Sequence, residues 1–150
     1  MNYFREKGDL NMGVTLDGPN TSIDFGGSGF MRLRLKVAEL TADDIFEHYK
    51  NLCYNMFKMS QNDFQEYDAK TESLNEKYNG RFSNILAFLY APDTSAILNE
   101  KICADVYNVI KDYDDDIAYG YAGRKDCAKF ADFKRVLLDC IENNTELEWF

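Results

Sequence analysis

The sequence is poor in the residues from which metal centres and nucleophilic active sites are commonly built. It has one histidine, His48, and its four cysteines never form a C-x-x-C pair. A zinc site needs clustered Cys and His ligands, so we expect no metal centre, and no motif indicates a cofactor. We expect reduced and mostly buried thiols, with two disulfides as the alternative, at four positions: Cys53, Cys103, Cys127 and Cys140.

The sequence also lacks long hydrophobic runs and an excess of basic residues. The longest apolar stretch, residues 85–91, is far shorter than the roughly 20 residues that span a bilayer. No apolar run follows the first charged residues, so we expect no signal peptide and a cytoplasmic protein. Lys and Arg number 17 against 26 Asp and Glu, which gives a net charge of −9. That sign disfavours direct binding to a nucleic-acid backbone.

What the sequence does contain indicates a single globular domain, residues 1–150. Hydrophobic residues make up 45% of the chain, with 11 Phe and 10 Tyr, and this apolar surface is enough to offset the entropy of ordering. A chain of this length has the usual size of one domain. The charge is unevenly distributed, because residues 1–37 hold five basic and four acidic residues. The remainder therefore carries −10, and the acidity belongs to the second part of the chain.

The first part of the chain, residues 1–38, is predicted to be mainly β. Two short segments, 11–16 and 21–25, flank an Asp-Gly-Pro-Asn sequence that is typical of turns. Apolar and basic residues alternate over 30–37, which predicts a third strand with one buried and one basic face. The glycine cluster at 26–29 precedes this predicted strand, whereas phosphate-binding loops open onto a helix. We therefore interpret the cluster as a hairpin connection.

The rest of the chain, residues 41–143, is predicted to be mainly α. Thr41 begins a Thr-Ala-Asp-Asp sequence similar to a capping box, and apolar residues then recur at helical spacing. The tail, residues 145–150, is predicted to add a final strand. The predicted fold class is α+β, with a small antiparallel sheet packed against about five helices. These helices are expected near residues 41–56, 61–78, 83–90, 95–112 and 128–142.

Four carboxylates lie within five positions at the end of the predicted fourth helix: Asp112, Asp114, Asp115 and Asp116. Their spacing resembles the start of an EF-hand loop, but Ile117 stands where that loop requires Gly, which excludes such a site. Acidic residues are unfavourable at the negative end of a helix dipole. We therefore predict that the cluster binds a partner, with a solvated helix end or the start of a loop as the alternative.

The next segment, residues 117–127, combines two tyrosines, two glycines and an Arg-Lys pair between two predicted helices. Tyr and Arg are enriched among the side chains that anchor protein interfaces. Tyr119, Tyr121 and Arg124 are therefore predicted to bind the same partner as the aspartates. The alternative is a loop whose aromatic residues pack on the core.

No catalytic arrangement can be picked out from the sequence. His48, Asp126 and Cys127 have the chemistry of a nucleophile system, but nothing in the sequence indicates an activating environment. We expect His48 on the polar side of its helix, at the surface. The 26 acidic residues leave carboxylate catalysis open, although no pair stands out. We assign no catalytic residue.

The predicted basic strand and the acidic tail carry opposite charges. Arg32, Arg34 and Lys36 would face solvent from the strand, and Glu146 and Glu148 lie in the tail. Opposite charges on neighbouring strands stabilise a sheet. We therefore predict that the tail lies beside residues 32–36.

Several short motifs are distinctive. They are Gly-Ser-Gly-Phe-Met-Arg-Leu-Arg at 27–34, Glu-His-Tyr-Lys at 47–50, Asp-Asp-Asp-Ile-Ala-Tyr-Gly-Tyr-Ala-Gly-Arg at 114–124, Asp-Phe-Lys at 132–134 and the closing Glu-Trp-Phe. With these motifs the chain resembles a family of small, uncharacterised acidic proteins of bacterial phages and mobile elements. The resemblance implies a mobile-element context and assigns no residue a role. In size and charge the chain is also similar to anti-CRISPR and other anti-defence inhibitors, which act by binding.

These observations lead to one main hypothesis. A non-enzymatic inhibitor would offer carboxylates in place of phosphates to the basic groove of a host nuclease or another nucleic-acid-binding defence protein. Its partner is then a basic protein, without direct nucleic-acid or membrane contact, and the chain is a monomer or homodimer. The alternatives are an immunity or antitoxin protein, an enzyme with unrecognised carboxylate chemistry, and a structural or regulatory module of a phage particle. A surface that is acidic only for solubility also remains open.

Overall fold

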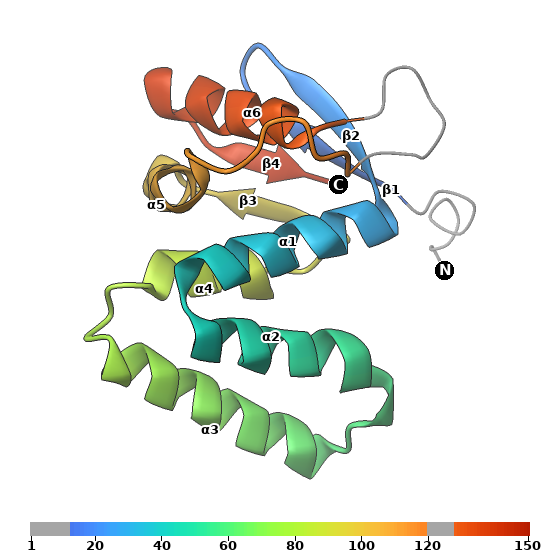
Figure 1. Ribbon diagram of the computed structural model, residues 1–150, viewed down its shortest axis with the longest axis vertical. Helices are drawn as coiled ribbons and strands as arrows, with labels where there is room; N and C mark the ends of the chain where they lie inside the picture. Colours follow the sequence, from blue (N-terminus) through green and yellow to red (C-terminus); the bar gives the residue numbers. More distant parts are fainter. Residues whose placement is uncertain (1–12, 120–127) are drawn as a thin grey trace.

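The computed structural model describes residues 13–119 and 128–150, in which helices pack on one side of a four-stranded antiparallel sheet (Figure 1). The strand order is β2-β1-β4-β3, so the C-terminal strand lies inside the sheet. The predicted α+β class and the predicted strand in the tail are confirmed. The strands are β1 (Gly13–Asp17), β2 (Ser22–Gly26), β3 (Ala96–Leu98) and β4 (Leu147–Trp149).

The hairpin of β1 and β2 follows from the turn-forming residues between the two strands. The amide of Gly18 donates to the carbonyl of Thr21 at 2.8 Å and closes the turn. Asp139 of the last helix accepts hydrogen bonds of 2.8 Å from the Asn20 amide and from the Thr21 hydroxyl. The hairpin is therefore fixed to the helical layer at its turn as well as along its buried face.

Residues 27–41 form helix α1 (Gly27–Thr41), and the strand predicted at 30–37 is wrong. The segment fits both a period of two and a period of 3.6 residues. Because it is long for a strand and is composed mostly of Met, Leu, Arg, Lys, Ala and Glu, its intrinsic preference favours the helix. The mainly β part of the chain therefore ends at Gly26. The buried positions have helical spacing: Gly29, Phe30, Leu33, Arg34, Val37 and Ala38.

The glycine cluster leads into this helix, so its interpretation as a hairpin connection is also wrong. Gly26 is the N-cap of α1. Gly29, in the first turn, packs so closely against the chain that an added Cβ would lie 1.7 Å from the carbonyl oxygen of Tyr119. The absence of a side chain at this position lets the start of α1 contact the segment that ends at residue 119.

The remaining helices agree well with their predicted positions, with one exception. The helix predicted over 95–112 starts later, because Ala96–Leu98 pairs with β4 as strand β3. The side chain of Asn99 then caps the helix by accepting from the Ile102 amide at 2.9 Å. The helices are α2 (Asp43–Asn55), α3 (Gln61–Lys77), α4 (Ser83–Tyr90), α5 (Glu100–Ile110) and α6 (Phe130–Glu142), with a 3₁₀ turn η1 (Met56–Lys58) between α2 and α3.

An aromatic cluster forms the centre of the core between the sheet and the helices. Trp149 of β4 is fully buried and its ring makes edge-to-face contacts with Phe30 at 5.1 Å and with Phe88 at 5.9 Å. The indole Nε1 donates to the Pro92 carbonyl at 2.8 Å, which satisfies its only polar group. The C-terminal strand is therefore part of the core that joins α1, α4 and the sheet.

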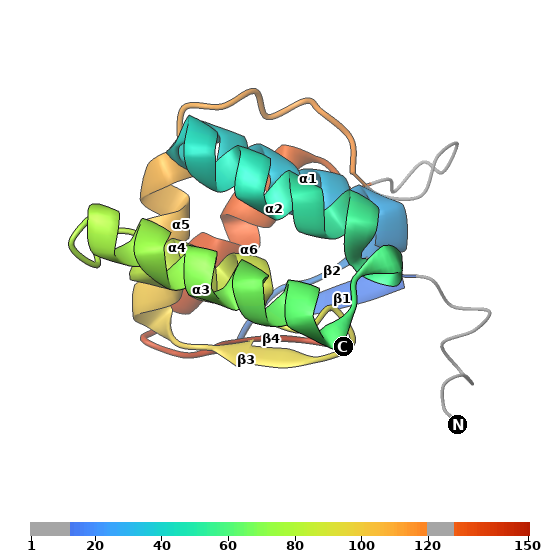
Figure 2. The same cartoon turned by 90° about the horizontal axis from the view of Figure 1, so that it is seen from below.

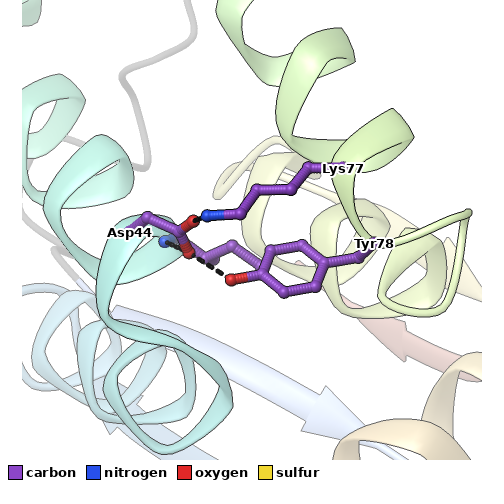
Figure 3. Close-up of polar contacts among 4 residues, drawn as sticks. Asp44, Lys77 and Tyr78 are labelled. Atoms are coloured by element: carbon purple, nitrogen blue, oxygen red, sulfur yellow. Dashed lines mark hydrogen bonds and ion pairs between the residues drawn. The ribbon is translucent and has the colours of Figure 1, made fainter.

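Helix α3 lies farthest from the sheet and is held mainly by polar contacts (Figure 1). Leu74 is its one buried residue. At the end of α3, Asp44 of α2 accepts from Lys77 Nζ at 2.6 Å and from the Tyr78 hydroxyl at 2.7 Å (Figure 3). An outer helix with so little buried apolar surface depends on such contacts for its position.

The predicted pairing of the basic segment with Glu146 and Glu148 across a sheet is wrong, although the guanidinium of Arg34 does lie 5.6 Å from the ring centroid of Trp149 in the tail. Arg34 and Lys36 lie in α1, whereas β4 pairs with β1 and β3. Lys36 instead forms an ion pair with Glu39, one turn along its own helix. The charge of Lys36 is therefore paired within its own helix.

Arg34 is buried, with 6% of its surface exposed. Its Nη1 donates to three carbonyls at the end of α4, those of Phe88, Leu89 and Ala91, at 2.8 to 3.2 Å. The last carbonyls of a helix have no partner within the helix and carry its negative dipole end. Arg34 therefore caps α4 from another helix.

No helix within residues 13–119 and 128–150 is long and apolar enough to cross a membrane.

Candidate partner-binding surface at the acidic loop

The predicted aspartates lie in the segment between α5 and α6, on the side of the helices away from the sheet. The segment runs along the upper edge of the molecule in Figure 2, opposite β3 and β4. We call residues 112–116 the acidic loop. Each of its four carboxylates is exposed: Asp112, Asp114, Asp115 and Asp116.

A single lysine of α6 holds the acidic loop in place. Lys134 is largely buried, and its Nζ donates to the carbonyls of Lys111 at 3.0 Å and Tyr113 at 2.6 Å. The same Nζ lies 2.7 Å from Oδ1 of Asp115. One ammonium group therefore fixes two backbone positions and one of the four carboxylates, while the other three carboxylates stay free of this contact.

Backbone hydrogen bonds complete the restraint. The Asp115 carbonyl accepts from the Ala131 amide at 3.1 Å, and the Ile117 carbonyl accepts from the Phe130 amide at 2.9 Å. Within the loop, Asp114 Oδ1 accepts from the Asp116 amide at 2.9 Å. The loop therefore has one arrangement, fixed against the start of α6, in which several carboxylates project into solvent. A preorganised anionic surface of this kind loses little entropy on binding a cationic partner.

Tyr119 is placed in the core and not on the surface. Only 2% of its surface is exposed, and its ring packs against Phe130 with centroids 5.6 Å apart. Its amide donates to the Ala128 carbonyl at 2.7 Å. Burial and the neighbouring Tyr113 raise its pKa, so the phenol stays neutral. Of the seven predicted binding residues, Tyr121 and Arg124 lie outside the described residues.

Lys134 contributes to this surface, although no motif in the sequence points to it. It lies four residues after Phe130 and three before Leu137, both of which are buried on the inner face of α6. A lysine on the inner face of a helix indicates a specific polar contact, because a buried ammonium group requires hydrogen-bond acceptors or an opposite charge. The sequence therefore marks Lys134 as unusual, although it does not indicate which acceptors it binds.

His48 does not lie at the surface as predicted. It is buried, with 4% exposed, and stacks on Tyr67 between α2 and α3. Burial lowers its pKa to about 4, with a smaller contribution from the charge of Lys70. The ring is therefore neutral near pH 7. Its supposed partners Asp126 and Cys127 lie outside the described residues.

The thiols that can be described are free, as predicted. Cys103 and Cys140 are buried and Cys53 is half-buried. Burial raises the pKa of Cys103 to about 12 and that of Cys140 to about 11, so neither is a thiolate near neutral pH. These two cysteines act as small apolar core residues.

A cavity of about 220 Å³ opens at one end of the sheet, and no residue of the acidic loop lines it. It contains neither histidine nor cysteine, so it holds no nucleophile activated by an imidazole. In the described part of the chain, no group of three or more His, Cys, Asp or Glu side chains is arranged to bind a metal ion. The cavity is lined by Asp17, Gly18, Pro19, Ile97, Thr145, Glu146 and Glu148.

Comparison with known proteins adds no family to this description. No protein-family model, no curated protein and no solved structure matches the chain.

Proposed function

We propose that this protein is a non-enzymatic acidic inhibitor of a mobile element, which blocks a nucleic-acid-handling host defence protein in an anti-CRISPR-like manner. Its carboxylates would occupy the basic surface on which that protein binds nucleic-acid phosphates. The observation that carries this proposal is the acidic loop, whose four carboxylates are exposed and whose backbone is held by Lys134 at Lys111 and Tyr113.

Charge and preorganisation support the proposal together. Like-charged side chains close together disfavour each other, and their repulsion is relieved when a cationic surface binds them. In the acidic loop, Asp115 alone has an ion-pair partner among the described residues, Lys134. The net charge of −9 adds long-range attraction to a basic partner, and this attraction weakens as salt is added.

The test is a displacement assay with purified proteins. A fluorescent duplex bound to a CRISPR nuclease, or to another defence nuclease, is titrated with this protein at several salt concentrations. We expect release of the duplex, with an inhibition constant that rises as salt increases. The triple variant D112N/D114N/D116N is expected to inhibit at least about tenfold less well. It leaves Asp115 in place for Lys134, and asparagine at 114 keeps the oxygen that accepts from the Asp116 amide.

A matched variant separates the loop from bulk charge. E66Q/E72Q/E76Q removes the same number of charges from exposed positions on α3 and is expected to inhibit like the wild type, apart from a small loss of long-range attraction. Equal losses in the two triple variants, or inhibition that does not respond to salt, would show that carboxylates in the acidic loop do not replace phosphates.

A further inference from the structure

One side of the sheet is uncovered in the part of the chain that the structure describes. In Figure 2, β3 and β4 lie along the lower edge of the molecule, with helices only above them. In β4, Leu147 and Trp149 are buried on the helical side and Glu148 between them is exposed. In β3, Leu98 is buried and Ile97 is 61% exposed. Alternate residues of the strands therefore form an exposed face, which we call the open sheet face.

The register places four side chains in one row across the open sheet face. Asp17 of β1 is opposite Ser22 of β2 on one side and opposite Glu148 of β4 on the other. Glu148 is in turn opposite Ile97 of β3. Two carboxylates therefore stand side by side at the centre of the row, with an apolar side chain at one end.

A second row lies next to the first. Thr15 of β1 is opposite Asp24 of β2, and its hydroxyl donates to Asp24 Oδ1 at 2.6 Å. On the other side, Thr15 exchanges two backbone hydrogen bonds with Phe150, of 2.8 and 3.1 Å. The side chain of Phe150 is 56% exposed. This row repeats the chemistry of the first, with a carboxylate and an exposed apolar group.

The two carboxylates at the centre of the first row, Asp17 and Glu148, repel each other when no partner is bound. Residues opposite each other in a hydrogen-bonded antiparallel pair have Cα atoms about 5.5 Å apart, and like charges there destabilise the sheet. No Lys or Arg within residues 13–119 and 128–150 forms an ion pair with Asp17, Asp24 or Glu148. The described residues therefore place a repulsive pair in the middle of the open sheet face and supply no ion-pair partner for it.

The open sheet face is also hollowed at this point. Asp17, Glu148 and Glu146 line the 220 Å³ cavity together with the apolar side chains of Pro19 and Ile97. Carboxylates beside an apolar wall suit a lysine or arginine side chain, which has an apolar stem and a cationic head. The hollow therefore has the size and the chemistry to hold a basic side chain of another protein.

We propose that the open sheet face is a docking surface for a basic protein segment, with a lysine or arginine of that segment in the hollow between Asp17 and Glu148. The inference rests on the proposed function, because it supplies a second contact surface for the same cationic partner. The surface is opposite the acidic loop in Figure 2, so the two can be tested separately. A second copy of this chain is disfavoured as the occupant, since two open sheet faces would bring carboxylates together.

The experiment uses the full chain and a short fluorescein-labelled peptide of alternating lysine and leucine, followed by anisotropy at low and moderate salt. A peptide with glutamate in place of lysine and one with serine in place of leucine serve as controls. We expect D17N/E148Q to bind the lysine–leucine peptide about tenfold less tightly than the wild type does, while D112N/D114N/D116N binds it within about twofold. The thermal midpoint of D17N/E148Q should equal or exceed that of the wild type, because the repulsive pair is gone.

A second variant keeps the inference testable if D17N/E148Q folds poorly. Ile97→Ser changes one exposed side chain. It should weaken binding of the lysine–leucine peptide more than binding of the lysine–serine peptide. Affinity lost in the acidic-loop variant and kept in D17N/E148Q would overturn this inference and leave the proposed function standing. Affinity unchanged in both variants, or binding of the glutamate peptide, would overturn it as well. So would a dimer in sedimentation that Ile97→Ser dissociates, since the occupant would then be a second copy.

Discussion

The imidazole of His48 lies face to face with the phenol ring of Tyr67, with ring centroids 3.7 Å apart and ring planes 10° from parallel. Its Nε2 is 2.7 Å from Oγ1 of Thr71. The Thr71 hydroxyl donates to the Tyr67 carbonyl at 3.0 Å, so it accepts a hydrogen bond from Nε2–H. This contact joins α2 to α3 through a neutral imidazole, whose pKa burial lowers to about 4.

We expect the stability of the protein to fall as the pH is lowered from about 6.5 to about 4. In this window the unfolded chain binds a proton on His48 that the native state does not bind, so the free energy of unfolding decreases as pH falls. The shift of the pKa corresponds to about 3 kcal/mol in total. Above pH 6.5 this contribution is fully present, and below about 4 it is lost. Urea unfolding at a series of pH values measures it.

The chain has a single histidine, which makes the test specific. His48→Gln is expected to be less stable than the wild type at pH 7 and to lose less stability between pH 6.5 and 4. The imidazole proton resonances of the wild type, which come from one residue, should not titrate above about pH 5. A folded-state midpoint near the ordinary value of 6.5 contradicts the buried neutral ring.

Asp44→Asn is expected to loosen the outer helix α3. Burial raises the pKa of Asp44, but hydrogen bonds from Lys77, Tyr78 and the Ile45 amide outweigh it and lower the pKa. The carboxylate is therefore favoured in its charged form, and its contribution to stability is lost as the pH falls below about 4. Hydrogen exchange should become faster in α3 and stay unchanged in the sheet. Lys77→Gln, which leaves the hydrogen bond from Tyr78 in place, should have the smaller effect.

The sequence predicted the helices with clear apolar periodicity and failed where two periods fit the same residues. Helix α4 was predicted with its observed ends, and α3 to within one residue. At 30–37 the residues fit both an alternating and a helical pattern. The alternating pattern was preferred because Arg34 was expected to face solvent, whereas it is buried in the helix. Its burial depends on the free carbonyls at the end of α4. That partner lies about 55 positions away, so no local pattern reveals it.

For the acidic loop, the sequence accounts for the exposure of the aspartates, and their binding to a partner stays a prediction. The exposure of its aspartates follows from their charge, since unpaired carboxylates are rarely buried. The inward position of Tyr119 and the role of Lys134 could not be predicted, because both depend on how the loop returns to α6. The open sheet face was missed for a similar reason. Asp17 and Glu148 are far apart in the sequence, and only the strand register makes them neighbours.

Arg34→Met is expected to destabilise the protein by about 2–4 kcal/mol. Methionine keeps much of the packing against Phe30 but leaves the last carbonyls of α4 without a donor, and each buried unpaired carbonyl costs about 1–3 kcal/mol. Arg34→Lys should recover part of the loss. Arg32→Met serves as the control, since Arg32 is exposed on the same helix. Chemical denaturation measures the free energy of unfolding of the three variants. Equal losses of stability on substitution at positions 32 and 34 contradict the capping role of Arg34.

Gly29→Ala is expected to destabilise the protein by about 1–3 kcal/mol, the usual cost of overpacking. The added methyl group would overlap the carbonyl of Tyr119, which is backbone and cannot turn aside. Either α1 or the segment at residue 119 must move. Ser28→Ala, at an exposed position in the same turn, should change the stability by less than about 0.5 kcal/mol. Thermal unfolding measures the stability of the two variants. A Gly29→Ala variant that is as stable as Ser28→Ala contradicts the close contact between Gly29 and Tyr119.

Lys134→Met separates the arrangement of the acidic loop from its charge. The variant keeps all four aspartates and makes the chain more negative by one unit, so bulk attraction alone predicts tighter binding to a basic partner. It also removes the donor to the carbonyls of Lys111 and Tyr113, so the loop becomes mobile and loses entropy on binding. We expect faster hydrogen exchange over residues 111–118 and inhibition at least about tenfold weaker in the displacement assay.

The control for this variant is Lys101→Met, which removes the same charge from an exposed position on α5. Its inhibition should equal or slightly exceed that of the wild type. Weaker inhibition by Lys134→Met together with unchanged inhibition by Lys101→Met can come only from the lost restraint, because both variants have the same net charge. If the two variants inhibit equally well, the hydrogen bonds of Lys134 serve stability alone, and the carboxylates act through their number and not through their arrangement.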